Sequence, residues 1–315
     1  MPDPRVAASV NQRLLNASRT IGIPHEALLR RYVFERLLHR IAGSEHAGDL
    51  CLKGAMSFLA VTGDIRRPTK DMDFLGRLDQ PAEETLAMFK AIAAIPPKVD
   101  DGLEFFVDDF SQETIKESAE RPGTRIHGVV GLGNARIKLK LEVAYGDVLT
   151  PGAVQMEYPT LLDAFEPPRI LVTSKETMLA EKFEAVCSLG ERNTRFKDFH
   201  DIRGLARMVE LDGGLAAEAL RATFANRGTT LPECDPVAFT PAFAEAGQRG
   251  WSAYQRKQGL RDGQRFEQLV EEIRPLVMGL VERARTGGTD ATWTPGAGWN
   301  EGPATEADTR AFVPF

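Results

Sequence analysis

In the first hundred residues the spacing of hydrophobic positions predicts four helices. Apolar side chains recur every three or four positions over residues 10–23 and 26–41, which predicts two amphipathic helices. The same pattern predicts helices over residues 55–61 and 81–94. Between these last two, residues 71–75 form a short run that we expect to be a strand.

The period then changes to two. Residues 103–110, 125–132 and 136–144 are predicted to be strands, and a Gly133-Asn134 turn separates the last two. In the third strand apolar and charged residues alternate strictly, in the order Ile137, Lys138, Leu139, Lys140, Leu141, Glu142 and Val143. This alternation predicts a sheet with one buried face and one polar face.

The second half of the chain is predicted to be mainly helical. Residues 151–168 are rich in Pro and Gly and are predicted to be a linker. Five helical patterns follow, over residues 174–189, 197–209, 215–227, 241–258 and 266–284. We therefore predict an α+β protein with a mixed-sheet core over residues 1–150 and a helical domain over residues 151–285. Residues 286–315 are predicted to be a flexible tail or a segment ordered by a partner.

Composition narrows the class of protein. The chain has 315 residues, of which 43% are hydrophobic and 27% charged. No apolar run approaches the ~20 residues that span a bilayer, and three scattered cysteines form no zinc spacing. We expect a cytoplasmic protein with no membrane partner. The net charge of −6 argues against a protein that coats nucleic acid, although a local basic groove remains compatible with it.

The segment around residue 70 carries the candidate chemistry. Asp71 and Asp73 lie two residues apart on a predicted strand, so both carboxylates point to one face. Paired carboxylates with substrate phosphates are the ligands that Mg²⁺ prefers. Gly54, which precedes the helix at residues 55–61, lets backbone N–H groups approach a phosphate. The alternative is a pair of solvated strand-end carboxylates.

Further carboxylates and a lysine are candidates for the same site. Glu142 is either an exposed strand residue or a third metal ligand beside the aspartate pair. Lys182 lies on an apolar helix face, and Asp198 and Asp201 lie on that of the next helix. These three form a structural ion pair between helices, or Lys182 contacts a triphosphate while an aspartate orients it. Both interpretations are compatible.

Two other features have functional and structural interpretations. A run of basic residues over 192–207 is either a solvated face or a surface that guides a polyanion to the site. Thr69 is a turn residue, or its hydroxyl faces the metal site. A phosphate on Thr69 would add roughly −1.5 to −2 charge and compete for the metal, which would inactivate the site.

These motifs together resemble one family. Five segments carry the resemblance: Leu-Lys-Gly-Ala-Met from residue 52, Arg-Pro-Thr-Lys-Asp-Met-Asp-Phe from 67, Leu-Glu-Val-Ala-Tyr-Gly-Asp from 141, Ala-Glu-Lys-Phe-Glu-Ala from 180 and Lys-Asp-Phe-His-Asp from 197. The chain is similar over about residues 20–260 to the AbiEii/AbiGii (MenT-like) nucleotidyltransferase toxins of type IV toxin–antitoxin systems. This family belongs to the DNA-polymerase-β-like superfamily.

The resemblance implies an activity and partners. It implies a toxin that transfers NMP from an NTP, with Mg²⁺, to RNA, and in some relatives to the tRNA 3′ acceptor end, so that translation stops. It also implies an AbiEi-like antitoxin as a partner. Alternatives are transfer to a small-molecule or protein hydroxyl, or a non-catalytic nucleotide-binding partner of an antitoxin.

The resemblance also assigns roles to residues. Metal ligands would be Asp71, Asp73 and Glu142. Catalytic residues would be Asp71, Asp73, Lys182, Asp198 and Asp201. Nucleotide contacts would come from Lys53, Gly54, Ser57, Thr69 and Lys182. The chain differs from many members in having Ala55 and Met56 after the glycine, and Glu142 where an aspartate is common.

Overall fold

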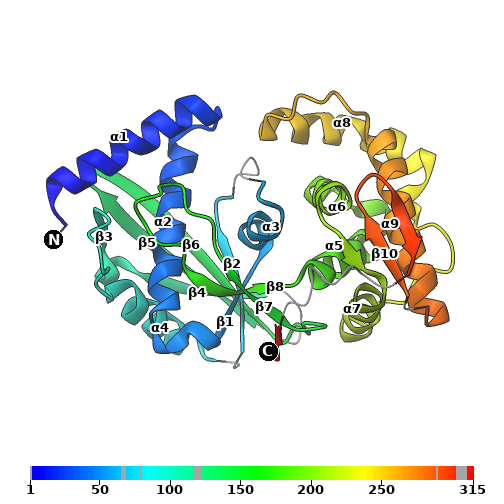
Figure 1. Cartoon of the computed structure of the whole chain (residues 1–315), viewed down its shortest axis with the longest axis horizontal. Coiled ribbons are helices and arrows are strands. Elements are labelled where there is room, and N and C mark those ends of the chain that lie inside the picture. Colours follow the sequence, from blue (N-terminus) through cyan, green and yellow to red (C-terminus); the bar gives the residue numbers. More distant parts are fainter. Residues whose placement is uncertain (1, 65–68, 78–79, 117–121, 289, 303–310) are drawn as a thin grey trace. The chain divides into compact units, whose positions relative to one another are not determined.

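The chain forms two compact units and passes between them three times (Figure 1). The computed structural model describes residues 2–64, 69–77, 80–116, 122–288, 290–302 and 311–315. Unit 1 comprises Met1–Gly146 and Gln155–Val172, and unit 2 comprises Asp147–Val154 and Thr173–Phe315. The first passage lies close to the predicted boundary at residue 150. The chain then returns to unit 1 through a segment that the sequence predicts to be a linker.

The helices of unit 1 lie close to the predicted ranges. They are α1 (Pro4–Ile21), α2 (His25–Ala42), α3 (Gly54–Thr62) and α4 (Ala82–Ala94), with 3₁₀ turns η1 (Glu45–Gly48) and η2 (Val107–Asp109). Helix α1 starts earlier than predicted because Asp3 caps it. The Asp3 side chain accepts a hydrogen bond from the Arg5 N–H, and Pro4 fits the first turn.

Unit 1 is built around a mixed sheet, which confirms the predicted fold class. Its strands are β1 (Leu50–Lys53), β2 (Met72–Gly76), β3 (Leu103–Phe105), β4 (Ser111–Lys116), β5 (Pro122–Leu132), β6 (Ala135–Tyr145), β7 (Ala153–Glu157) and β8 (Arg169–Thr173). The order is β7-β8-β1-β2-β6-β5-β3, with β4 also paired to β5. Strand β2 runs parallel to β6 and antiparallel to β1, while β8 runs parallel to β1.

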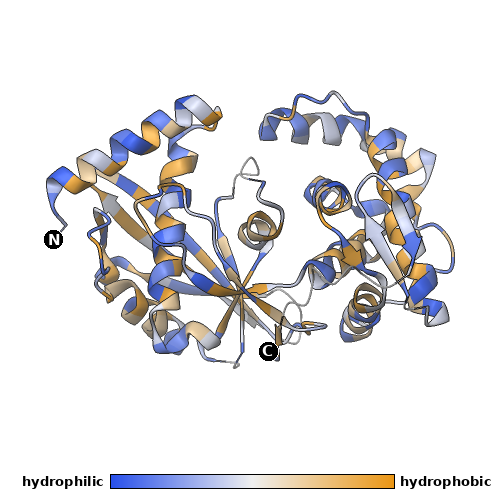
Figure 2. Cartoon of the chain, viewed as in Figure 1, coloured by the Kyte–Doolittle hydropathy of each residue, from blue (hydrophilic) through white to orange (hydrophobic). Residues whose placement is uncertain are grey.

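One face of this sheet is apolar and packs against helices. Met72 and Phe74 of β2 and Leu141 and Val143 of β6 are buried in the core with residues of α1, α2 and α4. The intervening residues, Asp73 on β2 and Lys140 and Glu142 on β6, point to the other face. Figure 2 shows this mixture of hydrophobic and hydrophilic colour along the central strands. The period-two pattern therefore predicts correctly which residues share the polar face.

Unit 2 is mainly helical, as predicted. Its helices are α5 (Lys175–Leu189), α6 (Phe196–Met208), α7 (Gly213–Asn226), α8 (Pro241–Gln258) and α9 (Phe266–Thr286), with 3₁₀ turns η3 (Gly190–Arg192) and η4 (Val237–Phe239). Aromatic rings pack α6, α8 and α9 together. The ring centroid of Phe266 lies 5.2 Å from that of Phe196 and 6.0 Å from that of Trp251. Close packing of α8 requires small residues, since a Cβ on Gly250 would lie 2.4 Å from the Phe196 ring.

The prediction of a flexible tail is wrong for much of the segment after residue 286. Strands β10 (Ala291–Thr294) and β11 (Gly298–Glu301) form a small sheet with β9 (Leu211–Asp212). Trp293 is buried and donates to the Ala206 carbonyl over 2.9 Å, and the Arg283 guanidinium lies 4.5 Å from the Trp299 ring. Two tryptophans in a polar segment are anchors that composition alone conceals. Strand β12 (Phe312–Val313) pairs with Ala153 and Val154.

None of the described helices has the length and apolarity needed to cross a bilayer.

Candidate functional site

A row of charged residues crosses the polar face of the sheet in unit 1. Asp73 of β2 is in register with Lys53 of β1 on one side and with Glu142 of β6 on the other. Glu142 is in register with Arg125 of β5, which is in register with Glu113 of β4. Residues that are directly opposite on neighbouring strands point to the same face. The predicted pair Asp73 and Glu142 is therefore brought together by the parallel pairing of β2 and β6.

The Asp73 carboxylate packs directly against Gly54. Gly54 begins helix α3 with a φ of +65°, a left-handed conformation that glycine adopts without strain. A Cβ at this position would lie 2.0 Å from Asp73 Oδ2. The first N–H groups of α3, at the positive end of the helix, therefore lie next to a carboxylate. These N–H groups favour the binding of an anion. Because Asp73 is itself negative, a cation would have to balance the charge of that anion.

Lys140 links the carboxylates and was not predicted as a site residue. Its Nζ lies 2.6 Å from Glu142 Oε1 and 3.3 Å from Asp71 Oδ2. Partial burial opposes its charge, but the hydrogen bond to Glu142 and the charges of Glu142 and Asp71 hold the pKa of Lys140 above its ordinary value. In this conformation the Lys140 ammonium group is the cation that lies between the carboxylates of Asp71 and Glu142.

Arg125 holds the other side of Glu142. Its Nε donates to Glu142 Oε1 over 2.8 Å, and its Nη1 donates to Glu113 Oε1 over 2.5 Å. This contact has a signal in the sequence. The two-residue turn at Gly133 and Asn134 fixes the register of β5 and β6, and that register places Arg125 opposite Glu142.

Thr69 contacts Asp71 directly. The Thr69 hydroxyl lies 2.7 Å from the Asp71 carbonyl oxygen and 3.0 Å from Asp71 Oδ1. The predicted turn role is thus realised, and the hydroxyl also touches a candidate metal ligand. The flanking Arg67 and Pro68 lie outside the described residues.

Ser57 has a structural contact in its own helix, and its predicted contact with phosphate stays a prediction. Its side chain is fully buried, and its hydroxyl donates to the Gly54 carbonyl over 2.9 Å. A hydroxyl three residues into a helix commonly satisfies the backbone of the preceding turn. In this structure the Ser57 hydroxyl proton is therefore used within α3 itself.

The second group of predicted residues assembles within unit 2. Lys182 of α5 donates to Asp201 Oδ2 of α6 over 2.5 Å and lies 3.9 Å from Asp198 Oδ1. Arg195 completes the group, with Nε 2.7 Å from Asp198 Oδ2. The Lys182 side chain is 12% exposed and that of Asp201 is 0% exposed. The structural interpretation of this group, an ion pair between helices, is therefore confirmed. Its role towards a triphosphate stays a prediction.

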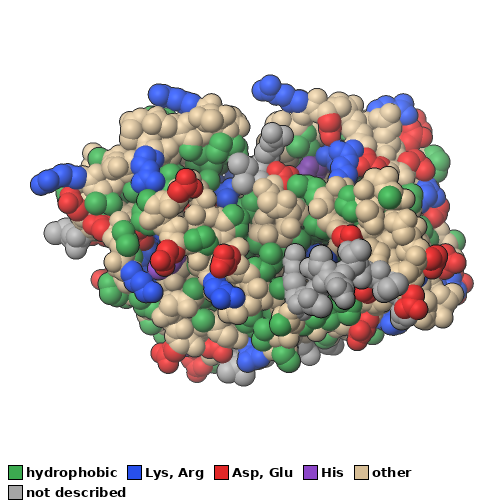
Figure 3. Space-filling model, in the orientation of Figure 1, with side chains coloured by type: hydrophobic (Ala, Val, Ile, Leu, Met, Phe, Trp, Pro, Cys, Tyr) green, Lys and Arg blue, Asp and Glu red, His purple; other side chains and the backbone are tan. Residues whose placement is uncertain are grey.

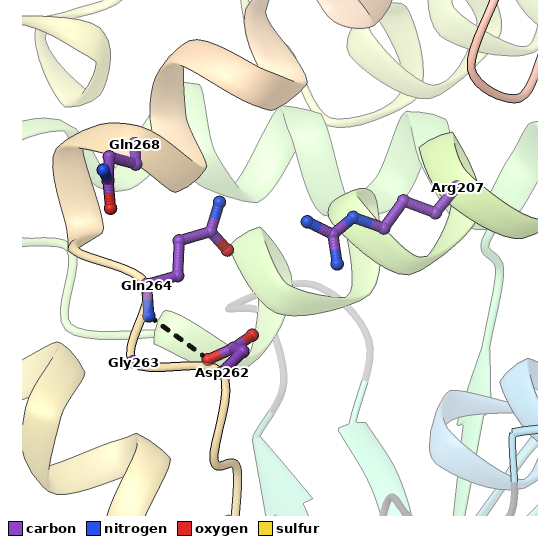
Figure 4. A pocket seen from close by; sticks show the side chains of 5 residues that line it. All are labelled: Arg207, Asp262, Gly263, Gln264 and Gln268. Carbon is purple, nitrogen blue, oxygen red and sulfur yellow. Dashed lines mark hydrogen bonds between the residues drawn. The ribbon is translucent and has the colours of Figure 1, made fainter.

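Three of the five Lys and Arg residues at 192–207 form ion pairs within unit 2. Besides Arg195, Arg203 binds Asp262 over 2.7 Å, and Arg207 binds Glu272. Figure 4 shows Arg207 at the edge of a shallow depression lined also by Asp262, Gly263, Gln264 and Gln268. Because carboxylates hold Arg203 and Arg207, the depression is a poor site for an anion. The role of the run towards a polyanion stays a prediction.

The residues at Asp71 and Asp73 suit a divalent cation. Among the described residues, no three His, Cys, Asp or Glu side chains stand close enough together to form a ready-made metal site. Beside Asp71 and Asp73 no third carboxylate completes such a site, because Glu142 is turned towards Lys140 and Arg125. The donor set is nevertheless all oxygen and anionic, and the space that a Gly54 Cβ would fill lies against Asp73. Both features fit Mg²⁺ with a phosphate ligand.

Comparison with known proteins supports the resemblance carried by the motifs. Residues 36–272 match the family model described as nucleotidyl transferase AbiEii toxin, type IV TA system. A structure from H. pylori with a provisional assignment as a nucleotidyltransferase is 16% identical, with a TM-score of 0.47, and the match covers 84% of this chain and 99% of that chain. JHP933 from Helicobacter pylori is also 16% identical, with a TM-score of 0.46 and coverage of 84% and 95%. No curated protein sequence matches this chain significantly.

Proposed function

Because the chain belongs to the AbiEii nucleotidyl transferase toxin family of type IV toxin–antitoxin systems, we propose that it transfers NMP from an NTP to RNA in a Mg²⁺-dependent reaction. The acceptor that we propose is the 3′ end of tRNA, whose modification would stop translation. The reaction joins the acceptor hydroxyl oxygen to the α-phosphorus and releases pyrophosphate. An AbiEi-like antitoxin is the proposed protein partner.

One observation carries this proposal: Gly54 packs directly against Asp73 of β2, and Asp71, just before β2, reaches Lys140 on the polar face of β6. Asp71 and Asp73 would hold Mg²⁺, which when bound neutralises phosphate charge and polarises the phosphoryl oxygens. Gly54 admits phosphate oxygens close to the first N–H groups of α3, because any side chain there would collide with Asp73. Glu142 stays the predicted third ligand.

The neighbouring cations have a supporting role. Arg125 and Lys140 both bind Glu142, so its carboxylate keeps a fixed position on the strand. Lys140 also balances the charge of Asp71. We propose that these two residues keep the acidic face folded when no divalent cation is bound, since adjacent carboxylates otherwise repel each other.

Thr69 provides a means of regulation under this proposal. Its hydroxyl lies within 3.0 Å of Asp71 Oδ1. A phosphate on that oxygen would place roughly −1.5 to −2 charge against the carboxylate. The expected result is a loss of metal and nucleotide binding.

The test is a transfer assay with the purified full chain. Protein, Mg²⁺, total tRNA and each α-³²P-labelled NTP are incubated, and label on RNA is measured. We expect label on tRNA, and we expect Asp71→Asn and Asp73→Asn each to lower the rate at least ~100-fold, since a metal ligand matters at least as much as its outer-shell partners. Asp108→Asn, at an exposed carboxylate of η2, is the matched control.

The same assay separates the alternatives. Label on a small molecule or on protein, with none on RNA, would replace RNA as the acceptor class. NTP binding without transfer would identify a non-catalytic nucleotide-binding protein. Transfer by Asp71→Asn at the wild-type rate would refute the assignment of the site.

A further inference from the structure

The outward face of α8 is built differently from its inward face. Residues 242, 245, 246, 249, 253, 256 and 257 are all exposed. At ~100° per residue these positions fall within about one third of the helix circumference. On the other side Ala244 and Trp251 are buried, and Gly247 and Gly250 face the rings of Phe266 and Phe196. The packing of unit 2 therefore uses one side of α8 and leaves the other in solvent.

Cations dominate the C-terminal half of this outward face. Arg249, Arg256 and Lys257 are exposed, and within the described part of the chain none of them has an ion pair or a side-chain hydrogen bond. Glu245, one turn before Arg249, is the acidic residue of the face. In the run at residues 192–207, by contrast, three of the five cations, Arg195, Arg203 and Arg207, are held by carboxylates.

We propose that this face, defined by Arg249, Ala253, Arg256 and Lys257, binds the phosphate backbone of the RNA substrate. The inference rests on the proposed function, because it names the surface through which unit 2 recognises the acceptor. The chain as a whole has a net charge of −6, so a long polyanion is attracted only where cations gather locally. Figure 3 shows basic side chains projecting from the part of the surface that α8 forms in Figure 1.

The spacing of these cations suits a charged chain. Arg249 and Arg256 are two helical turns apart, about 10 Å along the axis. This distance is close to the Debye length of ~10 Å at 0.1 M salt, so the three charges act together and not as isolated sites. Two of the three are arginines, whose planar guanidinium groups bind phosphate through two hydrogen bonds.

The neutral residues of the face favour RNA over a protein or a membrane. Exposed Ala242, Ala246 and Ala253 lie between the charged residues, and no large apolar or aromatic side chain lies on the face. A protein interface needs buried aromatic or aliphatic anchors, and an amphipathic helix on a membrane needs a large apolar face towards the lipid. In α8 the large residue, Trp251, is packed inside unit 2, where its Nε1 donates to the Gln264 carbonyl. Figure 2 colours α8 mainly as hydrophilic or neutral.

Binding of labelled tRNA at several salt concentrations tests the proposal. The full-length triple variant Arg249→Gln, Arg256→Gln, Lys257→Gln is compared with the wild type by fluorescence anisotropy at 50, 100 and 200 mM salt. The slope of log K against log salt is negative, and each lost phosphate contact should reduce its magnitude by ~0.7–0.9. We therefore expect the magnitude of the slope to fall by roughly 2 to 3, and the affinity at 50 mM salt to fall at least ~10-fold.

The matched control removes the same charge elsewhere. Arg5→Gln, Arg19→Gln, Lys98→Gln changes three exposed cations of unit 1 and should leave the slope and the affinity as in the wild type. A wild-type slope in the α8 variant, or an equal loss in the control, would overturn the proposal. So would an absence of tRNA binding by the wild type, or displacement of tRNA by polyglutamate as readily as by unlabelled tRNA.

The assay also separates this inference from the proposed function, because binding needs neither NTP nor turnover. If tRNA binds the wild type and is lost in the α8 variant while no nucleotide is transferred, the surface stands and the proposed function fails. Thermal unfolding of each variant, expected to match the wild type because the changed positions are exposed, excludes loss of fold as the cause.

Discussion

At the scale of single residues, the absence of one side chain shapes the candidate site. Gly54 combines a φ of +65° with a space that a Cβ would close, 2.0 Å from Asp73 Oδ2. Gly63, at the other end of α3, has a similar φ of +72° but nothing within 4 Å of a Cβ. The two glycines therefore separate the effect of backbone strain from the effect of the collision.

Gly54→Ala should lose both stability and activity. We expect a fall of about 1–2 kcal/mol in the free energy of unfolding from the left-handed backbone, and a further loss from the displaced carboxylate. Transfer should fall at least ~100-fold, because a shift of ~1 Å at a reacting group has that effect. Urea unfolding and the tRNA transfer assay measure the two effects.

The control is Gly63→Ala, which should lose a similar ~1–2 kcal/mol through its backbone and keep its transfer rate. Equal transfer rates for the two variants would show that the close contact of Gly54 with Asp73 has no functional importance.

Lys140 provides a second test at this scale. Replacement by glutamine removes the ammonium group from between Asp71 and Glu142, so the carboxylates gain more from a divalent cation. We expect Lys140→Gln to bind Mn²⁺ about 10-fold more tightly, which corresponds to ~1.4 kcal/mol, as measured by electron paramagnetic resonance titration. Its melting temperature should also depend more steeply on Mg²⁺ than that of the wild type.

Lys138→Gln is the matched control, because Lys138 is exposed two residues earlier on the same face of β6. Unchanged or weaker Mn²⁺ binding by Lys140→Gln would contradict the role given to Lys140.

At the scale of elements, periodicity predicts the long helices and the paired strands well because each has one buried face. Strand β6 shows this most clearly, since its alternation places Lys140 and Glu142 on the polar side. The missed elements are short. Strand β7 lies in the Pro/Gly-rich segment and β8 directly follows it, while β10 and β11 depend on Trp293 and its distant partner Ala206. Parallel pairing of β2 with β6, which unites Asp73 and Glu142, is likewise a long-range contact that no local pattern encodes.

The pair between α5 and α6 allows structural and functional roles to be separated. Lys182→Met should lower the free energy of unfolding by roughly 3–5 kcal/mol, because Asp201 and Asp198 would stay buried without their lysine. In the double variant Lys182→Met, Asp201→Asn most of this loss should be recovered, since the buried pair is replaced by two neutral groups. If Lys182 also contacts the triphosphate, the double variant folds but transfers no nucleotide.

Urea unfolding and tRNA labelling are measured together on these variants. The control pair Arg203→Met, Asp262→Asn removes another ion pair of unit 2, of 2.7 Å, and should keep its activity. If the double variant Lys182→Met, Asp201→Asn recovers its stability and transfers nucleotide at the wild-type rate, Lys182 has a structural role alone.

At the scale of the molecule, the two units are interleaved in sequence, and one buried carboxylate fixes the returning segment. Glu35 of α2 accepts hydrogen bonds from Arg31 Nε over 3.0 Å and from the Leu161 N–H over 2.9 Å. Burial raises the pKa of Glu35 from 4.5 to about 7, although Arg31 and the Leu161 N–H lower it in part. The folded protein therefore keeps this proton at pH values where the unfolded chain has lost it.

This difference predicts a pH dependence of stability. Between pH 4.5 and 7 the folded state binds more protons at Glu35 than the unfolded state, so the free energy of unfolding falls as the pH rises. The total loss in the free energy of unfolding that is due to Glu35 is roughly 3 kcal/mol, and this loss is complete above pH 7. Glu35→Gln should lack it, so the stability of the variant relative to the wild type should increase across this window.

Urea midpoints at pH 4.5, 5.5, 6.5 and 7.5 measure the effect, and Glu157→Gln, at an exposed position of β7, controls for the loss of a carboxylate. A constant difference between Glu35→Gln and the wild type over this range would contradict the prediction.

The return of the chain to unit 1 also has a consequence during synthesis. When Gly146 has left the ribosome, β1 still lacks its parallel neighbour, because Leu171 and Val172 of β8 pair with Cys51 and Leu52. At ordinary elongation rates those residues follow roughly one to five seconds later. A nascent chain that already contains Asp71, Asp73 and Glu142 thus waits with an open sheet edge, and premature termination before codon 172 releases a product that cannot complete the sheet of unit 1.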